Sequence, residues 1–394
     1  MTSRPPMETP DLAGAGADPV VLGTVRRVVA AEVAPRAAQL DSTSEFPQES
    51  YQALAAASVA GLLIPERWGG QQANTVTYAA AMEEIAAACG ATSTVYMTQM
   101  HCAHPILLAG TDAQRARWLA RLCQGKAYGA IAVSEPGAGS DVASMATIAR
   151  RDGDSYVLSG QKIFISTGDR ADVVVVFATV DRSRGRHAVT AFLIERDMPG
   201  FSAGRPMHKL GQRGASTVEL FLSDCRVPAR NRLGTEGKGY ALSISSVMKS
   251  RISAAAQGVG FARGAYERTV AHLGAQGMLS AARRDAQDVQ FAVAGIRTRI
   301  AAARAMLHAT AALVDGSEAD PVAEIAMAKL HCTELAVDVA AEAVELLGAD
   351  GDRVDLDVER MLRDAKVTQI YDGTNQIQRM LIARDIRLRQ ESRP

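Results

Sequence analysis

Residues that favour β-strands are concentrated in the middle of this chain, and their position limits the folds open to it. Short runs rich in β-branched and apolar residues lie at 156–158, 171–180, 188–194 and 217–222. The last run alternates between two sets of residues, which is the period of two expected of a strand with different faces. Because the strands do not alternate with helices, a doubly wound parallel sheet is not expected.

Helical patterns flank this region on both sides. Val21, Val25 and Val28 recur at helical spacing near the N-terminus, and Leu335 and Val339 do so in the C-terminal part. Hydrophobic residues make up 47% of the chain and aromatic residues only 5%, so the core must be built largely from alanine, valine, leucine and isoleucine. That composition favours closely packed helices.

These patterns predict an α+β fold. At roughly 150 residues per domain, the 394 residues suffice for two or three domains. We expect a flexible arm over residues 1–18, an all-helical domain over 19–128, a β-barrel or β-sandwich domain over 129–238 and a helical bundle over 239–394.

The composition limits which binding partners and which cellular compartment are expected for this protein. The 43 basic and 43 acidic residues balance, so no overall field draws the protein to nucleic acid or to a charged membrane. The five cysteines stand far apart without a CxxC pair, which argues against a disulfide framework or a zinc ribbon and favours a reduced, cytoplasmic compartment. No apolar run approaches the ~18 residues that span a bilayer, so we expect no membrane segment.

The segment with the clearest chemical meaning is 134–141, with the sequence SEPGAGSD. Its glycines, proline and hydroxyls favour a tight loop with exposed backbone N–H groups, which can hold phosphate oxygens or the polar edge of a flavin ring. Taken alone, the segment is equally compatible with an ordinary loop at the entrance of the β domain.

This loop is one of several motifs through which the chain resembles the acyl-CoA dehydrogenase family over nearly its whole length. The other motifs lie at 160–166, 209–220, 227–228 and 361–384. The resemblance implies the same division into helical, β and helical domains. It also implies an FAD-dependent oxidoreductase that acts on an acyl thioester of coenzyme A or of an acyl-carrier protein. A homotetramer or homodimer, and electron-transfer flavoprotein or oxygen as the electron acceptor, are implied as well.

The resemblance implies that nine residues bind FAD. They are Val133, Ser134, Gly139, Ser140, Phe164, Ile165, Ser166, Thr374 and Gln376. The first two would contact the flavin ring, and the run 164–166 would flank its other side with the Ser166 hydroxyl near N5. Thr374 and Gln376 match residues that reach the cofactor of a partner subunit. The family usually carries Trp and Thr where this chain has Phe164 and Ser166, and Phe164 also fits an ordinary core position.

The same resemblance implies a set of substrate-binding residues: Ser140, Arg251, Met97, Met100, Tyr371 and Gly373. Ser140 would lie along the pantetheine or phosphate portion, and Arg251 would help to hold the thioester carrier, although a surface ion pair explains an arginine there equally well. Met97 and Met100 would line the acyl pocket, in a segment that also contains His101 and His104. No carboxylate cluster accompanies these histidines, so we expect no metal site.

Asp372 is the candidate catalytic base, because it occupies the position of the family's usual glutamate in the segment 369–379. In the family, the base removes the α-proton of the thioester while the β-hydrogen leaves as a hydride to flavin N5. A flavin hydroxyl and the base's own backbone N–H polarise the carbonyl. Aspartate is one methylene shorter, and a misplacement of ~1 Å can lower a rate about 100-fold. Ser250 stands at the alternative base position of some relatives and cannot replace it. An aspartate before Gly373 is also typical of an ordinary turn.

Two segments that hold the adenosine half of FAD in relatives differ here. The region 274–280 lacks the usual Arg-x-x-Phe-Gly pattern, and Glu345 with 348–351 stands where relatives have Gln followed by Gly-Gly-x-Gly.

Two alternative functions therefore stay open. One is a flavin oxidase, decarboxylase or monooxygenase of the same fold that acts on a more acidic carbon, as nitroalkane-oxidase-like relatives do, or on a β-keto acid. The other is a binding protein without flavin.

Overall fold

The computed structural model describes residues 16–317 and 321–391, so the predicted flexible arm lies almost wholly outside the described residues. The last residue of that arm, Asp18, caps the first helix, since its side chain accepts hydrogen bonds from the backbone N–H groups of Val20 and Val21. The N-terminal helices are α1 (Pro19–Val28), α2 (Ala37–Thr43), α3 (Gln48–Ala56), α4 (Thr75–Ala88), α5 (Gly90–Ala109) and α6 (Asp112–Cys123).

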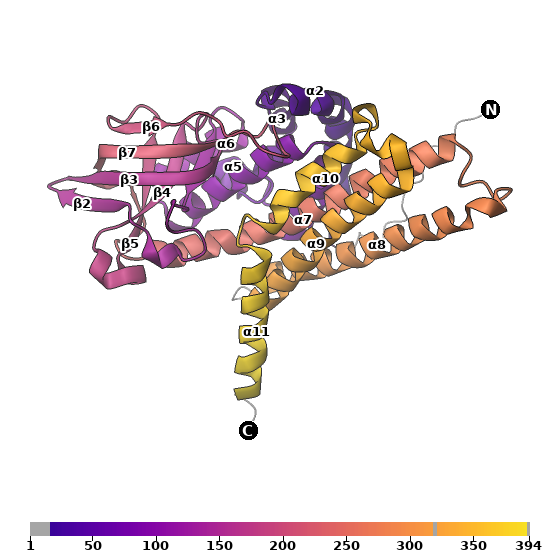
Figure 1. Cartoon of the computed structure of the whole chain (residues 1–394). Helices are drawn as coiled ribbons and strands as arrows, with labels where there is room; N and C mark the ends of the chain where they lie inside the picture. The colour runs from indigo at the N-terminus through magenta and orange to yellow at the C-terminus, as the bar shows by residue number, and fades with distance from the viewer. Residues whose placement is uncertain (1–15, 318–320, 392–394) are drawn as a thin grey trace.

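The strands of the described residues form one sheet (Figure 1). They are β1 (Gly129–Ala132), β2 (Ile148–Asp152), β3 (Ser155–Ser166), β4 (Val173–Thr179), β5 (Val189–Glu195), β6 (Phe201–Ala203), β7 (Thr217–Pro228) and β8 (Arg232–Leu233). Their order across the sheet is β6-β7-β3-β2-β4-β5-β8, and β1 pairs in parallel with β4. The four runs predicted from the sequence overlap β3, β4, β5 and β7.

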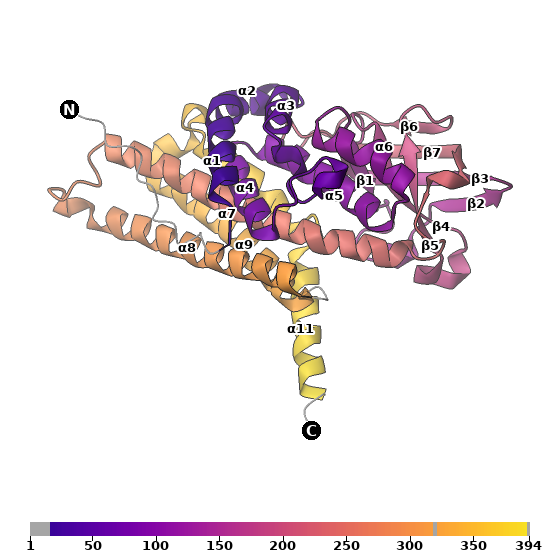
Figure 2. The same ribbon diagram turned by 180° about the vertical axis from the view of Figure 1, so that it is seen from behind.

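The rest of the chain forms long helices, shown from two sides in Figures 1 and 2. They are α7 (Gly239–Ala275), α8 (Gln287–Gly316), α9 (Val322–Leu347), α10 (Val358–Lys366) and α11 (Asn375–Glu391). The longest, α7, runs from the β domain along the bundle and packs against α4, α5 and α9. In contrast, α11 projects away from the body of the molecule (Figure 1).

Two glycines of α7 permit the close approach of neighbouring helices. A Cβ added to Gly258 would lie 2.5 Å from the carbonyl oxygen of Cys332 on α9. One added to Gly260 would lie 2.7 Å from the carbonyl oxygen of Glu83 on α4. Only glycine fits at both positions without moving a backbone. The glycines of this helix therefore serve helix packing, which brings α4, α7 and α9 together around the site described below.

A buried carboxylate joins three helices of the bundle. Glu83 of α4 forms ion pairs with Arg263 of α7 (3.1 Å) and Arg304 of α8 (2.6 Å). Burial alone would raise the pKa of Glu83, but the two guanidinium charges outweigh this effect and hold the pKa below its usual value of 4.5. The carboxylate is therefore ionised at neutral pH and stabilises the helix packing.

The folded state should lose stability in acid through Glu83. Because the pKa of Glu83 is lower in the folded chain than in the unfolded chain, its contribution to the free energy of unfolding is complete above about pH 4.5. That contribution is lost as the pH falls through the folded-state value. We expect the urea midpoint, followed by circular dichroism, to fall more steeply from about pH 5 to pH 3 in the wild type than in Glu83→Gln. Equal slopes in the two proteins would contradict this role.

The structure also describes the cysteines, the apolar character of the helices and the groups of metal-binding side chains. The five cysteines are all buried and free. None of the helices in residues 16–317 and 321–391 combines the length and the apolar character needed to cross a bilayer. Within the same residues, no group of three or more histidine, cysteine, aspartate or glutamate side chains is arranged to hold a metal ion.

Candidate active site

The glycine-containing loop follows directly from β1 and is fixed to a neighbouring strand. The carbonyl oxygen of Ser134 accepts a hydrogen bond from the N–H of Ile163 on β3 (3.0 Å). Glu135 and Ala138 exchange two backbone hydrogen bonds, which close the loop into a tight turn. A Cβ added to residue 137 or 139, both glycines, would meet no atom within 4 Å. The backbone of this turn is therefore accessible from outside.

Glu135 of this loop and Lys162 of β3 form a buried ion pair. Lys162 Nζ lies 2.7 Å from Glu135 Oε1 and donates a hydrogen bond to the carbonyl oxygen of Val133 (3.1 Å). The carboxylate also accepts hydrogen bonds from the N–H groups of Ala146 (2.5 Å) and Thr147 (3.1 Å). Burial lowers the pKa of Lys162 to about 8 in spite of its partner. Burial would raise the pKa of Glu135, but the Lys162 charge and the hydrogen bonds outweigh it and keep that pKa below its usual value. The pair is ionised at neutral pH and ties β1, the loop and β3 together.

β3 contains a bulge at the residues expected to flank a flavin. Lys162 pairs with Leu220 of β7, and Ile165 pairs with Val218. Between these two pairs β3 therefore contains one residue more than β7, which is a β-bulge. The bulge places Phe164 in the left-handed region (φ 59°), which is costly for a residue other than glycine. The Phe164 side chain is 66% exposed, whereas Ile165 is buried. The alternative that Phe164 is a core residue is therefore wrong, because the bulge turns its ring out of the sheet.

Asp372 lies in the turn between the short helical segment Val367–Gln369 and α11. Asp372 and Gly373 both have positive φ, at 55° and 85°. The Asp372 carbonyl oxygen accepts a hydrogen bond from Nε of Arg251 on α7 (3.2 Å), and Gln378 Nε2 donates to the Gly373 carbonyl oxygen (2.7 Å). One carboxylate oxygen of Asp372, Oδ2, is buried without a hydrogen-bond partner among the described residues. Buried polar atoms are nearly always hydrogen-bonded, so this oxygen needs an explanation beyond the turn.

Two buried cations lie around this turn. Arg251 is only 7% exposed, so the alternative of a surface ion pair is wrong. Burial lowers the pKa of Arg251, and the charge of Asp372 opposes that shift. On α9, burial lowers the pKa of Lys329 to about 8, the charge of Asp372 again opposing. Lys329 Nζ donates to Oδ1 of Asn375, the first residue of α11 (2.8 Å). The turn is thus held from two helices.

A chain of hydrogen bonds connects Tyr371 to more distant elements. Its hydroxyl donates to Oε1 of Gln257 on α7. Gln257 Nε2 donates to Oγ of Ser93 (2.9 Å) and to Oγ1 of Thr94 (3.3 Å), both on α5. The Thr94 hydroxyl then donates to Oε1 of Gln212, in the loop before β7 (2.5 Å). These bonds join the Asp372 turn to both the N-terminal helices and the β domain.

A small cavity lies near Asp372, where α4, α5 and α7 meet. We call it the polar cavity, and its lining includes Tyr78, Met100, His101, His104, Lys249 and Ser253. Ile252 of this lining directly follows Arg251, which bonds the Asp372 carbonyl oxygen. Burial raises the pKa of Tyr78 and lowers that of His101, and the charge of Asp372 adds a rise to both. Met97, on the same helix as Met100, is buried in the adjoining core.

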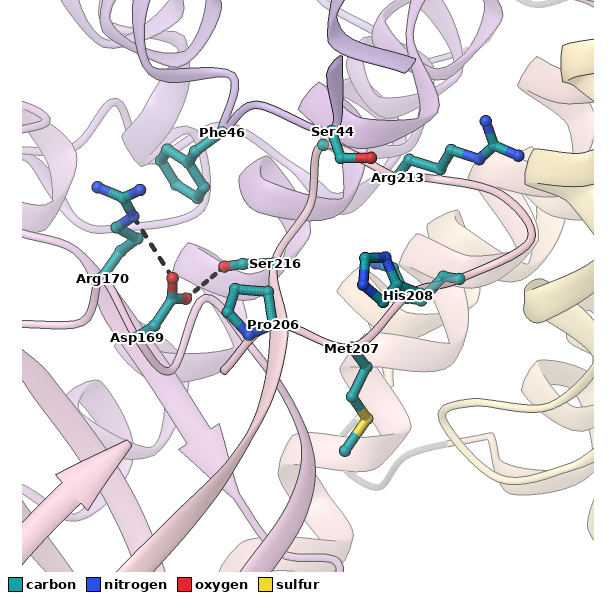
Figure 3. Close-up of a pocket in the computed structure, with 11 residues that line it drawn as sticks. Ser44, Phe46, Asp169, Arg170, Pro206, Met207, His208, Arg213 and Ser216 are labelled. Carbon is teal, nitrogen blue, oxygen red and sulfur yellow. Dashed lines mark hydrogen bonds and ion pairs between the residues drawn. The ribbon is translucent and has the colours of Figure 1, made fainter. Parts of the chain in front are cut away.

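A larger cleft, of about 320 Å³, lies one turn beyond the end of β3 (Figure 3). There Asp169 accepts a hydrogen bond from the Ser216 hydroxyl (2.5 Å) and pairs with Arg170 (3.5 Å). The Arg170 guanidinium in turn lies over the ring of Phe46. None of the residues predicted to bind flavin or substrate lines this cleft. We therefore place the candidate active site at the Asp372 turn.

Part of the predicted cofactor set is presented to the outside. Gly139 and Ser140 are exposed, and so is Gln376 on the projecting helix α11. Thr374 and Ser166 are half-buried. The two regions that differ from the family pattern meet in space: Gln276 Nε2 donates a hydrogen bond to Asp350 Oδ2 (3.3 Å), after the end of α9.

Four buried polar side chains that shape the site were missed from the sequence: Glu135, Gln212, Gln257 and Lys329. Each is at most 5% exposed. Glu135 lies inside the motif 134–141 and Gln212 inside the motif 209–220, and these motifs are the sequence signal for a role of both residues in the site. Gln257 and Lys329 lie in alanine-rich helices, where a polar residue is usually expected to face solvent.

Comparison with known proteins places these observations in a family. Models of the acyl-CoA dehydrogenase N-terminal, middle and C-terminal domains match residues 20–126, 130–225 and 237–387. A curated relative, cyclohex-1-ene-1-carbonyl-CoA dehydrogenase of Geobacter metallireducens, is 38% identical over 93% of this chain and 96% of the relative. The solved butyryl-CoA dehydrogenase from Megasphaera elsdenii has a TM-score of 0.88 and 32% identity, over 93% of this chain and 97% of that one. The prolyl acyl carrier protein oxidase AnaB has a TM-score of 0.86 and 31% identity, over 94% and 99%. With its three domains matched in order and its fold shared over more than nine-tenths of its length, this chain belongs to the acyl-CoA dehydrogenase family.

Proposed function

We propose that the protein is an FAD-dependent oxidoreductase that removes hydrogen from the α- and β-carbons of an acyl thioester, with Asp372 as the catalytic base. The observation that carries the proposal is the buried, unpartnered Oδ2 of Asp372 near the polar cavity. A general base must offer a free lone pair to its substrate. The relatives named above include dehydrogenases of CoA thioesters and an oxidase of a carrier-bound acyl group, which supports either carrier for this protein.

The residues of the β domain fit a flavin. The turn at Gly137 and Gly139 has room beside its backbone for cofactor atoms. On β3, the exposed Phe164 offers an aromatic ring. We infer that Val133, Ser134 and the run 164–166 hold the flavin ring, while Gly139 and Ser140 hold the phosphate region. When bound, FAD supplies the hydride acceptor of the reaction.

The turn around Asp372 is arranged for proton removal from the substrate. Arg251 holds the Asp372 carbonyl oxygen and Gln378 holds that of Gly373, so the carboxylate is positioned before substrate arrives. In the proposed reaction, Asp372 Oδ2 takes the α-proton. The backbone N–H of Asp372 donates to the thioester carbonyl oxygen and stabilises the negative charge that develops there.

The proposal is tested by flavin content and product mass together. The purified protein should be yellow, and it should convert an acyl thioester into a product lighter by two hydrogen atoms. Protein that takes up no flavin on titration would favour the binding-protein alternative. A flavin-loaded protein that releases carbon dioxide or adds oxygen to its product would favour the decarboxylase or monooxygenase alternative. Oxygen uptake compared with reduction of an artificial dye distinguishes an oxidase from a dehydrogenase.

We also propose that two or four copies assemble through surfaces that include α11. This helix projects from the body (Figure 1). It carries Met380 and Ile386, which are 66% and 54% exposed. Apolar side chains exposed on a helix that projects from the body are available for contact with a second copy. In such an assembly, Thr374 and Gln376 at the start of α11 would contact the cofactor of a partner subunit.

The double substitution Met380→Glu and Ile386→Glu is expected to yield a smaller particle in sedimentation velocity, because charges cannot be buried in an apolar contact without a partner. The variant should also retain less FAD after gel filtration. Arg184→Glu changes an exposed residue between β4 and β5, outside α11, and serves as the control. An unchanged sedimentation coefficient in the double variant would show that α11 is not part of a subunit contact.

A further inference from the structure

Seven of the ten residues that line the polar cavity carry polar or ionisable groups, although most of its accessible surface is apolar. Only three of its ten lining residues, Leu63, Met100 and Ile252, are aliphatic or thioether side chains. Acyl chains without polar groups gain their binding free energy from apolar surroundings. If the acyl group enters beside Asp372, the part that reaches this cavity meets histidine, lysine and hydroxyl side chains as well as apolar surface.

Two histidines of α5 have nitrogen atoms that lack a partner. His101 Nε2 and His104 Nε2 are both buried, and neither makes a hydrogen bond with any of the described residues. Both side chains line the polar cavity. Buried polar atoms are nearly always satisfied, so two orphaned atoms at one small cavity indicate that a ligand atom completes them.

Three hydroxyl groups of the cavity, unlike the two histidine nitrogens, have hydrogen-bond partners within the protein. Tyr78 and Ser253 are hydrogen-bonded to each other (2.8 Å), and the Ser246 hydroxyl donates to the carbonyl oxygen of Leu242 (2.8 Å). These bonds give each of these three hydroxyls a partner, whereas the Nε2 atoms of the two imidazoles have none among the described residues. A polar group that enters the cavity can therefore bond to His101 and His104 without displacing the bonds of these hydroxyls.

Both imidazoles are neutral at pH 7. Burial lowers the pKa of His104 to about 4, with a smaller contribution from the positive charge of Lys249. Burial also lowers the pKa of His101, although the charge of Asp372 opposes this. A neutral imidazole nitrogen either donates or accepts one hydrogen bond, according to its tautomer. Two such nitrogens can bind an oxygen atom that accepts from one and donates to the other, or that accepts from both.

We propose that the polar cavity selects short acyl chains that carry an oxygen-bearing group at the end remote from the thioester. The inference rests on the proposed function, because it assigns the far end of the same substrate. The cavity volume is about 20 Å³, which is room for about one water-sized group. An oxygen function of that size would satisfy both histidines, whereas a methyl group would leave them unpaired.

The test compares matched thioesters that differ only at the chain end. Butyryl-CoA is set against 4-hydroxybutyryl-CoA, and pentanoyl-CoA against 5-hydroxypentanoyl-CoA and glutaryl-CoA, with kcat/KM measured for each in an artificial-dye assay. We expect the favoured oxygenated chain to exceed its plain partner about 10- to 100-fold, because a site built to hydrogen-bond an oxygen discriminates against its absence. The hydroxyl and carboxylate arms show which oxygen function fits.

Substitution assigns the preference to the two histidines. His101→Leu with His104→Leu should bring the ratio of kcat/KM values close to one, while His104→Gln, which keeps a hydrogen-bonding group, should retain most of it. His331→Leu, at an exposed position of α9, is the matched control. The flavin absorbance of each purified variant shows that it has folded.

Two results would overturn the inference alone. One is a wild type that oxidises plain chains at least as well as oxygenated ones, and the other is a double variant that keeps the full preference. A flavin-loaded wild type that oxidises none of these thioesters would overturn the proposed function as well. The two failures are therefore distinguishable in one set of assays.

Discussion

Replacing Asp372 with asparagine is expected to lower the rate of flavin reduction by an acyl thioester by about 100- to 10,000-fold, the usual contribution of a general base. Asparagine has nearly the same size and also tolerates positive φ, so the turn with Gly373 should persist. What it lacks is a basic carboxylate oxygen at the position of Oδ2. Rapid-mixing absorbance measurements under anaerobic conditions give the rate directly.

The control for this prediction is Asp385→Asn. Asp385 lies on α11 and pairs only with Arg389 at the surface (2.7 Å) among the contacts described, so the flavin reduction rate should not change. Both variants should retain FAD and unfold near the wild-type temperature. If the Asp372 variant were reduced within about tenfold of the wild-type rate, another group would have to be the base.

The second large effect is expected from Lys162→Met. This change leaves the Glu135 carboxylate buried without its cation, and breaking one side of a buried ion pair typically costs about 3–5 kcal/mol in the free energy of unfolding. Lys162 also holds the carbonyl oxygen of Val133, next to the proposed flavin site. We therefore expect both a lower urea midpoint and weaker retention of FAD.

A second variant tests whether the buried charge is the cause. Lys162→Met combined with Glu135→Gln removes both charges and keeps an acceptor for the N–H groups of Ala146 and Thr147, so it should recover much of the lost stability. Arg226→Met serves as the control, because it breaks an exposed ion pair with Asp152 and should cost no more than about 1 kcal/mol. If the double variant were as unstable as Lys162→Met, packing rather than charge would explain the loss.

The larger elements of this fold could be predicted from the sequence because their patterns are long and strong. β4 is a run of buried β-branched residues, and α9 keeps one apolar face over many turns. The strands that were missed, β1, β2, β6 and β8, have two to five residues. In β2, three of the five residues are exposed, so its pattern does not identify a strand. Such strands form because their neighbours provide hydrogen-bond partners, which the sequence does not display.

The site was predictable only where neighbouring residues carry the signal. The loop 134–141 and the Asp372 turn are local motifs, and both are present as compact turns. The contacts that complete them join residues far apart in the chain, such as Tyr371 with Gln257 and Lys329 with Asn375. The exposure of Phe164 depends on a bulge, which arises from the register of β3 with β7. These features follow from tertiary packing.

The most direct test of the proposed chemistry is an isotope measurement on a single turnover. FAD-loaded protein is mixed anaerobically with an acyl thioester deuterated either at the α-carbon or at the β-carbon, and the loss of flavin absorbance is timed. Removal of an α-proton by Asp372 coupled to departure of a β-hydride predicts slower bleaching with each deuterated thioester, and no bleaching on this timescale in Asp372→Asn. Bleaching that is insensitive to deuterium at the β-carbon would contradict α,β-dehydrogenation.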